Sequence, residues 1–280
     1  MSVVAMINEK GGVGKTSSCM HLGGAIARRG LRVMLVDNDP QCSLTKGLLG
    51  NEAARGLDPA TTLYALYDEL PMDADDLIRP TEFEGLSLLA GSAAAKRFNV
   101  PEPHLLPFDE QARLREGLRP LAAGFDITII DSCPNLQYCT WSGLLAADAA
   151  IIPTQPELYG AQGLAEVRDW LALVEQGWGR PIPVAGVLVT MHNARRAMHK
   201  TFVELLGADT PELLEAVVPE SADFPEAIAA LRPIHWHKPR GAAARAMDAV
   251  ADEILGRLAA LGLGPEVAQV EQRSTGKEAA

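Results

Sequence analysis

The sequence contains few cysteines, and their spacing argues against two classes of site. Its 280 residues include four: Cys19, Cys42, Cys133 and Cys139. No two of them form a Cys-x-x-Cys pair, which argues against a zinc ribbon or a thiol–disulfide redox motif. We therefore expect reduced thiols with no bridge between them.

A long hydrophobic run and an excess of positive charge are also missing. No apolar stretch approaches the length needed to cross a membrane, and Glu9 and Lys10 interrupt the N-terminal region where a signal peptide would be apolar. The net charge of −11 disfavours a globally basic nucleic-acid binder, so any contact with DNA must come from a local patch. With 48% apolar and 22% charged residues, the chain has the composition of a globular protein, which we expect in the cytoplasm.

Short apolar runs alternate with amphipathic helical patterns along most of the chain. We expect strands at Val3–Ile7, Arg32–Val36, Leu86–Leu89, Ile127–Ile130, Ala149–Pro153, Val184–Thr190 and Ala216–Val218. These runs are continuously apolar, as strands are when helices cover both faces of a parallel sheet. The pattern predicts an α/β fold: a single domain over residues 1–263 with a doubly wound, mostly parallel sheet flanked by helices.

The remaining segments complete this organisation. The last helical pattern is predicted to pack on the sheet, because apolar residues recur at helical spacing at Met247, Val250, Ile254, Leu258 and Leu261. Two stretches, Asn51–Pro59 and Ala93–Pro107, are predicted to be irregular surface connections. Residues 264–280 are polar and small, and we expect a frayed tail there.

The most informative motif follows the first expected strand, at residues 9–17 (Glu-Lys-Gly-Gly-Val-Gly-Lys-Thr-Ser). A phosphate-binding loop reads Gly-x-x-x-x-Gly-Lys-Ser/Thr. Its glycines let backbone N–H groups close on phosphates, its lysine reaches the outer phosphates and its hydroxyl binds Mg²⁺. Here the end of the motif, 14–16, is intact. Glu9 stands where the first glycine belongs, and Gly11 and Gly12 supply the freedom to turn.

The sequence around this loop matches what a nucleotide site requires. An apolar strand precedes it, and a helical pattern follows in which Cys19, Leu22 and Ile26 recur before Gly30 stops the helix. The loop also carries one lysine more than the motif needs, Lys10. We therefore predict a deviant nucleotide-binding P-loop; the alternative is a glycine-rich turn that binds nothing.

Carboxylates at the ends of two other expected strands are candidates to complete the nucleotide site. Asp131 follows one apolar run, at the position where a P-loop enzyme places a carboxylate beside Mg²⁺. Asp37 and Asp39 follow another run, and the carboxyl ends of parallel strands meet at the edge of the sheet where the loop lies. Asp39 is a candidate to orient the hydrolytic water, and Asp37 to support the magnesium shell. The alternative is that these aspartates only cap ordinary turns.

Taken in order and spacing, the motifs resemble the ParA/Soj branch of the deviant Walker A ATPases. They are Lys-Gly-Gly-Val-Gly-Lys-Thr at 10–16, Asp-x-Asp-Pro-Gln at 37–41, Ile-Ile-Asp at 129–131 and Pro-Thr-Gln-Pro-Glu at 153–157. The similarity continues through Thr190 and Met191 to the last helix, so it covers nearly the whole chain. It implies a P-loop NTPase fold of the deviant Walker A type, with ATP and Mg²⁺ as cofactors.

The resemblance also implies roles for individual residues. Relatives form an ATP sandwich, a homodimer in which the signature lysine reaches the partner's nucleotide and neutralises charge in trans, as an arginine finger does. The expected catalytic residues are Lys10 in that role, Lys15 on the outer phosphates and Asp39 at the water. The nucleotide would be bound by Gly11, Gly12, Val13, Gly14, Lys15, Thr16, Ser17, Met191 and Pro219, although the last two are equally compatible with the core. Mg²⁺ would be held by Thr16, Asp37 and Asp131, with the aspartates acting directly or through water.

Relatives use slow ATP hydrolysis to move DNA or other cargo. The ATP-bound dimer binds DNA non-specifically, and a ParB-like partner stimulates hydrolysis and release. The resemblance therefore implies a slow, partner-stimulated ATPase that associates with the nucleoid. The sequence leaves the cargo open between plasmid or chromosomal DNA and a protein compartment or cluster positioned on the nucleoid.

Part of the family's DNA patch follows the strand that ends at Thr190, where this chain has the basic segment 191–200. On a helix, Arg196 and Lys200 would be i, i+4 neighbours. Without the resemblance, a cluster of this size is usually a solvated face. Where relatives often carry basic residues, this chain has Glu220 and Asp223, so DNA binding is expected to be weaker or to depend more on other residues. The expected DNA-binding residues are Arg195, foremost, with Arg196, Lys200, Lys238 and Arg240.

A MinD-like positioning ATPase that cycles on and off membranes is an alternative. It would need a C-terminal amphipathic helix with bulky apolar and basic faces, and the residues beyond Gly264 show neither. Relatives that bind iron–sulfur clusters use cysteines in other settings than Cys133 and Cys139. We expect no membrane partner and no cluster.

Overall fold

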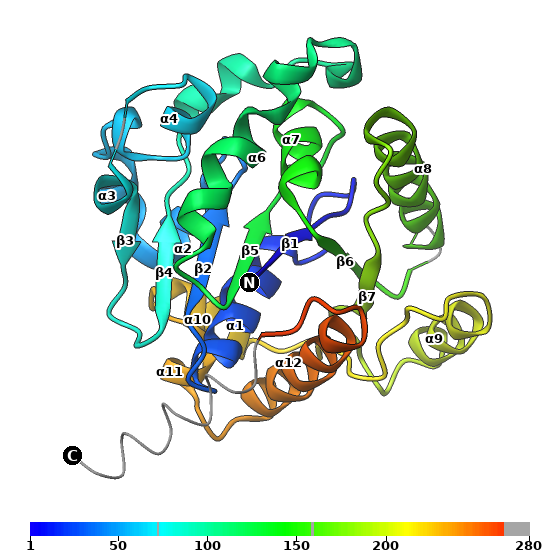
Figure 1. The fold of residues 1–280 in the computed structure, drawn as a ribbon. Coiled ribbons are helices and arrows are strands. Elements are labelled where there is room, and N and C mark those ends of the chain that lie inside the picture. The colour runs from blue at the N-terminus through cyan, green and yellow to red at the C-terminus, as the bar shows by residue number, and fades with distance from the viewer. Residues whose placement is uncertain (72, 158–159, 266–280) are drawn as a thin grey trace.

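The computed structural model describes residues 1–71, 73–157 and 160–265 (Figure 1). Within these residues seven strands form one sheet, in the order β3-β4-β2-β5-β1-β6-β7. The strands are β1 (Ser2–Met6), β2 (Val33–Asp37), β3 (Ile78–Pro80), β4 (Leu86–Leu89), β5 (Ile127–Asp131), β6 (Ala149–Thr154) and β7 (Val184–Val189). Every neighbouring pair is parallel except β3 and β4. The predicted α/β fold with a doubly wound, mostly parallel sheet is confirmed.

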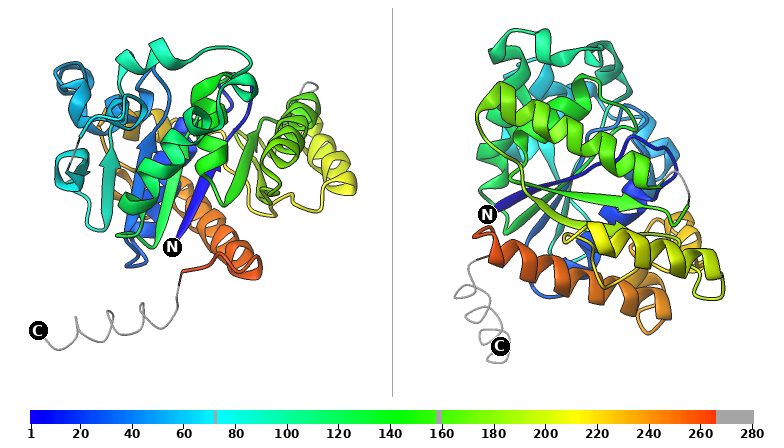
Figure 2. Two further views of the ribbon diagram at one scale, coloured as in Figure 1. Left: turned by 45° about the horizontal axis from the view of Figure 1, so that its top comes forward. Right: turned by 90° about the vertical axis from the view of Figure 1, so that its right-hand side faces the viewer.

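Helices cover both faces of the sheet (Figure 2). They are α1 (Lys15–Ala27), α2 (Ser43–Leu49), α3 (Asn51–Arg55), α4 (Tyr64–Tyr67), α5 (Ala74–Leu77), α6 (Phe108–Ala122), α7 (Tyr138–Ala146), α8 (Gly160–Trp178), α9 (Ala197–Asp209), α10 (Asp223–Ala229), α11 (Ile234–His237) and α12 (Ala242–Ala260), with 3₁₀ turns at Pro59–Thr61, Ala93–Phe98 and Pro103–Leu105. On one face α1, α2, α10, α11 and α12 enclose an apolar core. On the other face α4, α6 and α7 enclose a second cluster, and α7 and α8 a third.

The last long helix packs largely as the sequence predicts. Met247, Val250, Ile254 and Leu258 of α12 are buried in the core beneath the sheet. The prediction was wrong for Leu261, which is 43% exposed. Since α12 ends at Ala260, Leu261 no longer follows the helical spacing.

Two predictions about strands and connections need correction. Ala216–Val218 is not a strand. Val218 donates its N–H to the carbonyl of Val189 and accepts the N–H of His192, but the adjoining bridge at Pro219 is isolated and no continuous ladder forms. The connections at Asn51–Pro59 and Ala93–Pro107 are not wholly irregular, because the first contains α3 and the second contains two 3₁₀ turns. The sequence also gave no sign of β3, a three-residue antiparallel strand at the sheet edge.

The two edges of the sheet end differently. β3 carries Pro80 at its end, and β7 is flanked by Leu213, which forms an isolated parallel bridge to Val187.

No helix in the described part of the chain is long and apolar enough to cross a membrane. From residue 266 onward, the expected tail lies outside the described residues.

Candidate nucleotide-binding site

The loop between β1 and α1 has the backbone of a phosphate cradle. Gly12 and Gly14 have φ values of 80° and 84°, in the left-handed region that favours glycine. A Cβ atom on Gly11 or Gly12 would meet nothing within 4 Å, so a ligand has room to approach the backbone there. The first turn of α1 begins at Lys15, and its N–H groups and dipole favour an anion at the same place.

Three side chains hold this loop, and each follows the end of a strand. Asn8 accepts a hydrogen bond from the backbone N–H two residues later, at 2.9 Å. The Gln155 amide donates to the carbonyl of Gly12 at 3.1 Å, and the Thr190 hydroxyl donates to that of Val13 at 2.9 Å. Sequence reasoning did not assign them to the site, although their places just after β1, β6 and β7 were a usable signal.

Lys15 is buried at the centre of the loop, with only 7% of its surface exposed. Its Nζ donates to the carbonyls of Asn8 and Lys10 at 2.8 and 2.9 Å, so the ammonium group lies inside the turn of the loop. Burial lowers the pKa of Lys15, and the negative charges of Asp131 and Asp39 oppose that shift. The neighbouring carboxyl groups thus offset part of the cost of burying this ammonium group.

Lys10 has a different environment on the outer side of the loop. It is partly exposed and lies beside α8, where a Cβ on Gly163 would be 3.8 Å from Lys10 Cδ. Glu166 lies on the same helix. Hydrogen bonds from Glu9 and Gln162 lower the pKa of Glu166, and the charge of Lys10 lowers this pKa further. The two lysines of the loop therefore differ in burial: Lys15 faces inward and Lys10 lies at the surface.

Two buried carboxylates end the central strands. Asp37 of β2 and Asp131 of β5 are both fully buried. Burial and the charge of Asp37 raise the pKa of Asp131 to about 8, while the Thr16 hydroxyl and Lys15 act in the opposite direction. Burial also raises the pKa of Asp37 to about 6, against the hydrogen bonds that Thr45 donates to it. A cation close to these groups would be strongly favoured.

The donor atoms fit Mg²⁺ at Asp131 better than at Asp37. Oδ2 of Asp131 is buried and has no hydrogen-bond partner among the described residues. Oδ2 of Asp37, in contrast, accepts from both the hydroxyl and the N–H of Thr45, at 2.6 and 2.7 Å. No group of three or more metal-ligating side chains occurs in the part of the chain that the structure describes. Proteins often hold Mg²⁺ through one or two side chains together with phosphates and water.

Asp39 lies in the turn that follows β2. Its Oδ1 accepts the N–H of Gln41 at 2.8 Å, and its carbonyl accepts the N–H of Cys42 at 2.7 Å. Asp39 is partly exposed, and its charge contributes to raising the pKa values of both Lys15 and Asp131. The structure therefore brings Asp39, Asp131 and Lys15 into one electrostatic environment.

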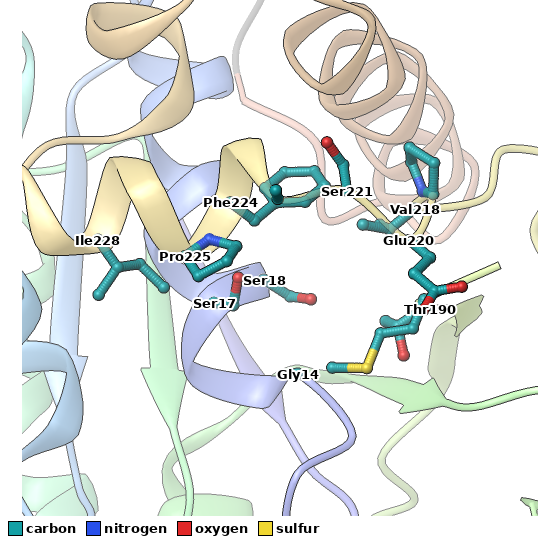
Figure 3. A pocket seen from close by; sticks show the side chains of 13 residues that line it. Gly14, Ser17, Ser18, Thr190, Val218, Glu220, Ser221, Phe224, Pro225 and Ile228 are labelled. Carbon is teal, nitrogen blue, oxygen red and sulfur yellow. The ribbon is translucent and has the colours of Figure 1, made fainter. Parts of the chain in front are cut away.

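A pocket of about 450 Å³ opens beside the loop. It is lined by Gly14, Ser17, Ser18, Thr190, Met191, Val218, Pro219, Glu220, Ser221, Ala222, Phe224, Pro225 and Ile228. Figure 3 shows Gly14 on one side of this space and Phe224 with Pro225, from α10, on another. Met191 and Pro219 thus lie on the wall of a largely apolar pocket that adjoins the phosphate loop, an arrangement suited to a nucleotide base. No sequence pattern indicated that α10 would contribute.

The expected DNA-binding residues fall into two groups. Arg196 lies 3.6 Å from Glu220, and Lys238 makes ion pairs with Asp223 and Glu226 at 2.6 and 2.8 Å. The acidic residues that sequence analysis singled out therefore partly neutralise two of the five cations. The others are exposed, and the described residues include no ion pair to them: Arg195, Lys200 and Arg240.

One expectation about this basic segment was wrong. Arg195 and Arg196 do not lie on a helix with Lys200, because α9 begins only at Ala197 and Arg196 is extended. Asn193 explains the late start, since its side chain accepts the backbone N–H of Arg195 at 3.0 Å and holds a turn there.

The loop at the carboxyl end of a parallel sheet, with its second lysine and the carboxylates ending β2 and β5, defines a P-loop ATPase of the deviant Walker A type. Comparisons agree. The family model described as an AAA domain matches residues 1–180. The sporulation initiation inhibitor protein Soj of Bacillus subtilis is 32% identical over 256 residues, which are 90% of this chain and 97% of Soj. The chain belongs to the ParA/Soj family of partition ATPases.

Solved structures show the same fold. A variant of McdA from Cyanothece in complex with ATP has a TM-score of 0.76 at 19% identity and covers 95% of this chain and 98% of its own. Cobyrinic acid a,c-diamide synthase from Mycobacterium smegmatis, with an ATP analogue and magnesium, has a TM-score of 0.69 at 26% identity, over 86% of this chain and 97% of its own.

Proposed function

We propose that this ParA-type positioning ATPase binds ATP and Mg²⁺, dimerises around the nucleotides, binds DNA non-specifically and partitions plasmid or chromosomal DNA. A ParB-like partner would stimulate its slow hydrolysis, and the protein would work in the cytoplasm on the nucleoid. The observation that carries the proposal is the arrangement of the two lysines: Lys15 is enclosed by the loop, whereas Lys10 lies on its outer side. The nucleotide-bound relatives with this fold support the choice of ATP and Mg²⁺.

Separate groups of residues bind the phosphates and Mg²⁺ in this proposal. Lys15 and the N–H groups of the loop hold the outer phosphates of the chain's own nucleotide. Thr16 and Asp131 would hold Mg²⁺, which when bound neutralises charge on those phosphates. Asp37, bonded to Thr45, supports the site from behind and stabilises the start of α2.

Water activation is assigned to Asp39. Its Oδ1 is held by the N–H of Gln41, which leaves Oδ2 to orient the attacking water and accept its proton. Lys10 supplies the missing positive charge to the nucleotide of the partner protomer. Hydrolysis in this scheme depends on dimerisation, because no single protomer contains the complete set of charges.

DNA binding is assigned to the exposed cations after β7 and before α12. Arg195, Lys200 and Arg240 have no ion pair among the described residues, and a dimer would present each of them twice. Six phosphate contacts of this kind would give weak, strongly salt-dependent binding without sequence preference.

The test is ATP turnover with Mg²⁺, with and without DNA and the product of the neighbouring gene, together with the mass in solution by light scattering. The proposal expects an ATP-dependent dimer, retention of DNA and stimulation by a ParB-like neighbour. Absence of Mg²⁺-dependent turnover under all of these conditions would refute it. Stimulation by an unrelated neighbour, without any DNA cargo, would favour a non-DNA cargo instead.

A further inference from the structure

Asn38, the residue between the two aspartates that end β2, is buried, with 1% of its surface exposed. Its backbone N–H donates to the carbonyl of Asp131 at 3.0 Å, which extends the β2–β5 ladder. Its side chain uses both ends of the amide. Nδ2 donates to the carbonyl of Cys139 in α7, and Oδ1 accepts the hydroxyl of Tyr67 from α4, each at 2.6 Å.

Tyr67 connects this amide to a second helix. It is the last residue of α4, its side chain is completely buried, and its hydroxyl lies 2.8 Å from Oγ of Ser142 in α7. Burial raises the pKa of Tyr67 well above its ordinary value, so the hydroxyl keeps its proton and remains a donor. The Asn38–Tyr67–Ser142 network therefore joins the end of β2 to α4 and α7.

The packing around Asn38 leaves its amide little freedom. A Cβ on Gly143 of α7 would lie 2.9 Å from Asn38 Nδ2, so this helix approaches as closely as it does only because residue 143 is glycine. The Cys133 thiol, two residues beyond the end of the neighbouring strand β5, donates to the carbonyl of Asn38 at 3.5 Å. An amide that is satisfied at both ends and enclosed in this way is rigid, since any rotation would leave buried polar atoms unpaired.

Asp39, in contrast, has only local support. It makes hydrogen bonds within its own turn, to Gln41 and Cys42, its N–H donates to Oδ1 of Asp37 at a long 3.4 Å, and it is partly exposed. Its orientation toward Lys15 and Asp131 therefore depends on the residue that precedes it.

We propose that the Asn38–Tyr67–Ser142 network positions Asp39 for hydrolysis, with Asn38 and Tyr67 as positioning residues that touch neither nucleotide nor water. The proposal rests on the proposed function, in which Asp39 orients the attacking water. It predicts that α4, which contributes no residue to the nucleotide pocket among those described, affects turnover and not nucleotide affinity.

The test compares Tyr67→Phe with Tyr64→Phe. Tyr64 lies on the same helix, and its hydroxyl bonds to Asp68 at 2.9 Å, away from the network. Tyr67→Phe should lower kcat for ATP about tenfold or more and leave KM within about twofold, because misplacement of a water-orienting group affects the chemical step. Tyr64→Phe should change neither. A loss of kcat that is equal in the two variants, or a change confined to KM, would overturn the proposal.

Amide hydrogen exchange without nucleotide gives a readout that does not depend on catalysis. The amides of Gln41 and Cys42, which bond to Asp39, should exchange at least about fivefold faster in Tyr67→Phe and remain unchanged in Tyr64→Phe. Equal exchange in the two variants would refute the positioning role, even if the wild type proved to have no ATPase activity. A wild-type protein without ATPase activity would refute only the proposed function.

Should Tyr67→Phe fail to fold, Ser142→Ala serves as a second variant and should show the same pattern with smaller changes. Exchange rates and a kcat equal to those of the wild type in Ser142→Ala would overturn the proposal.

Discussion

Asp131 lies directly opposite Asp37 in the register of β5 and β2, and both carboxyl groups are fully buried. Two carboxyl groups so placed cannot both ionise without cost unless a cation accompanies them. This relationship makes the stability of the nucleotide-free protein depend on pH.

We expect Asp131→Asn to stabilise the nucleotide-free protein at alkaline pH. The pKa of Asp131 in the folded state, about 8, lies above the value of an unfolded chain, so the native state holds a proton that the unfolded state has lost between about pH 4 and 8. Stability due to this group therefore falls as pH rises through that window. With EDTA present, denaturant unfolding should show a gain of about 5 kcal/mol for the variant at pH 8, since each pKa unit corresponds to about 1.4 kcal/mol, and almost none near pH 4. An equal gain at both pH values would contradict the assignment.

Lys10→Ala should abolish partner-stimulated hydrolysis and leave nucleotide binding measurable. The expected loss of stimulated turnover is on the order of 100-fold or more, because a charge supplied in trans is removed from the transition state. Lys15→Ala should instead weaken binding itself, since its Nζ lies inside the loop. Fluorescent-nucleotide titration and phosphate release separate the two effects, and unchanged stimulated turnover in Lys10→Ala would refute the sandwich mechanism.

Asp39→Ala should trap an ATP-bound dimer. The substitution removes the carboxylate assigned to the water and leaves Lys10, Lys15 and Thr16 in place, so dimerisation should proceed while hydrolysis does not. Light scattering should give a dimer that persists for hours with ATP and Mg²⁺. A variant that stays monomeric under these conditions would show that Asp39 has another role.

Arg195→Ala should weaken ATP-dependent DNA retention more than Lys238→Ala does. Lys238 is already paired with Asp223 and Glu226, whereas Arg195 has no ion pair within the described residues. Binding measured over a range of salt concentrations should show a slope smaller by about 1 for each Arg195 lost, or about 2 per dimer. An equal loss of DNA retention in the two variants would mean that the ion pairs of Lys238 open when DNA binds. As a control, the affinity for ATP should be unchanged in both variants.

Local signals accounted for most of the sheet and for the centre of the site. Apolar runs located six strands of the sheet with shifts of about one residue at their ends, as β2 shows at Val33–Asp37 against the expected Arg32–Val36. The motif alone placed Lys10 and Lys15 on one loop. The sequence did not predict β3, because three residues that include a proline show no periodic pattern. The pairing of β3 with β4 depends on tertiary contacts.

The rest of the site depends on contacts between distant segments. Thr190 reaches the loop from β7, and Tyr67 reaches Asn38 across 29 positions of sequence. Nor could the sequence reveal that Glu220 would lie beside Arg196, because ion pairs between separate loops follow from the folded path and not from spacing. Such partnerships are properties of the assembled sheet.

The sheet edges bear on how the protein behaves when crowded. β3 is only three residues long and ends in Pro80, which offers no N–H to an incoming strand, and the β7 edge is bridged by Leu213 at Val187. Strand-to-strand pairing of copies, a common route to fibrous aggregates, is therefore hindered at both edges of the sheet. A protein with such edges resists edge-to-edge aggregation even at high local concentration.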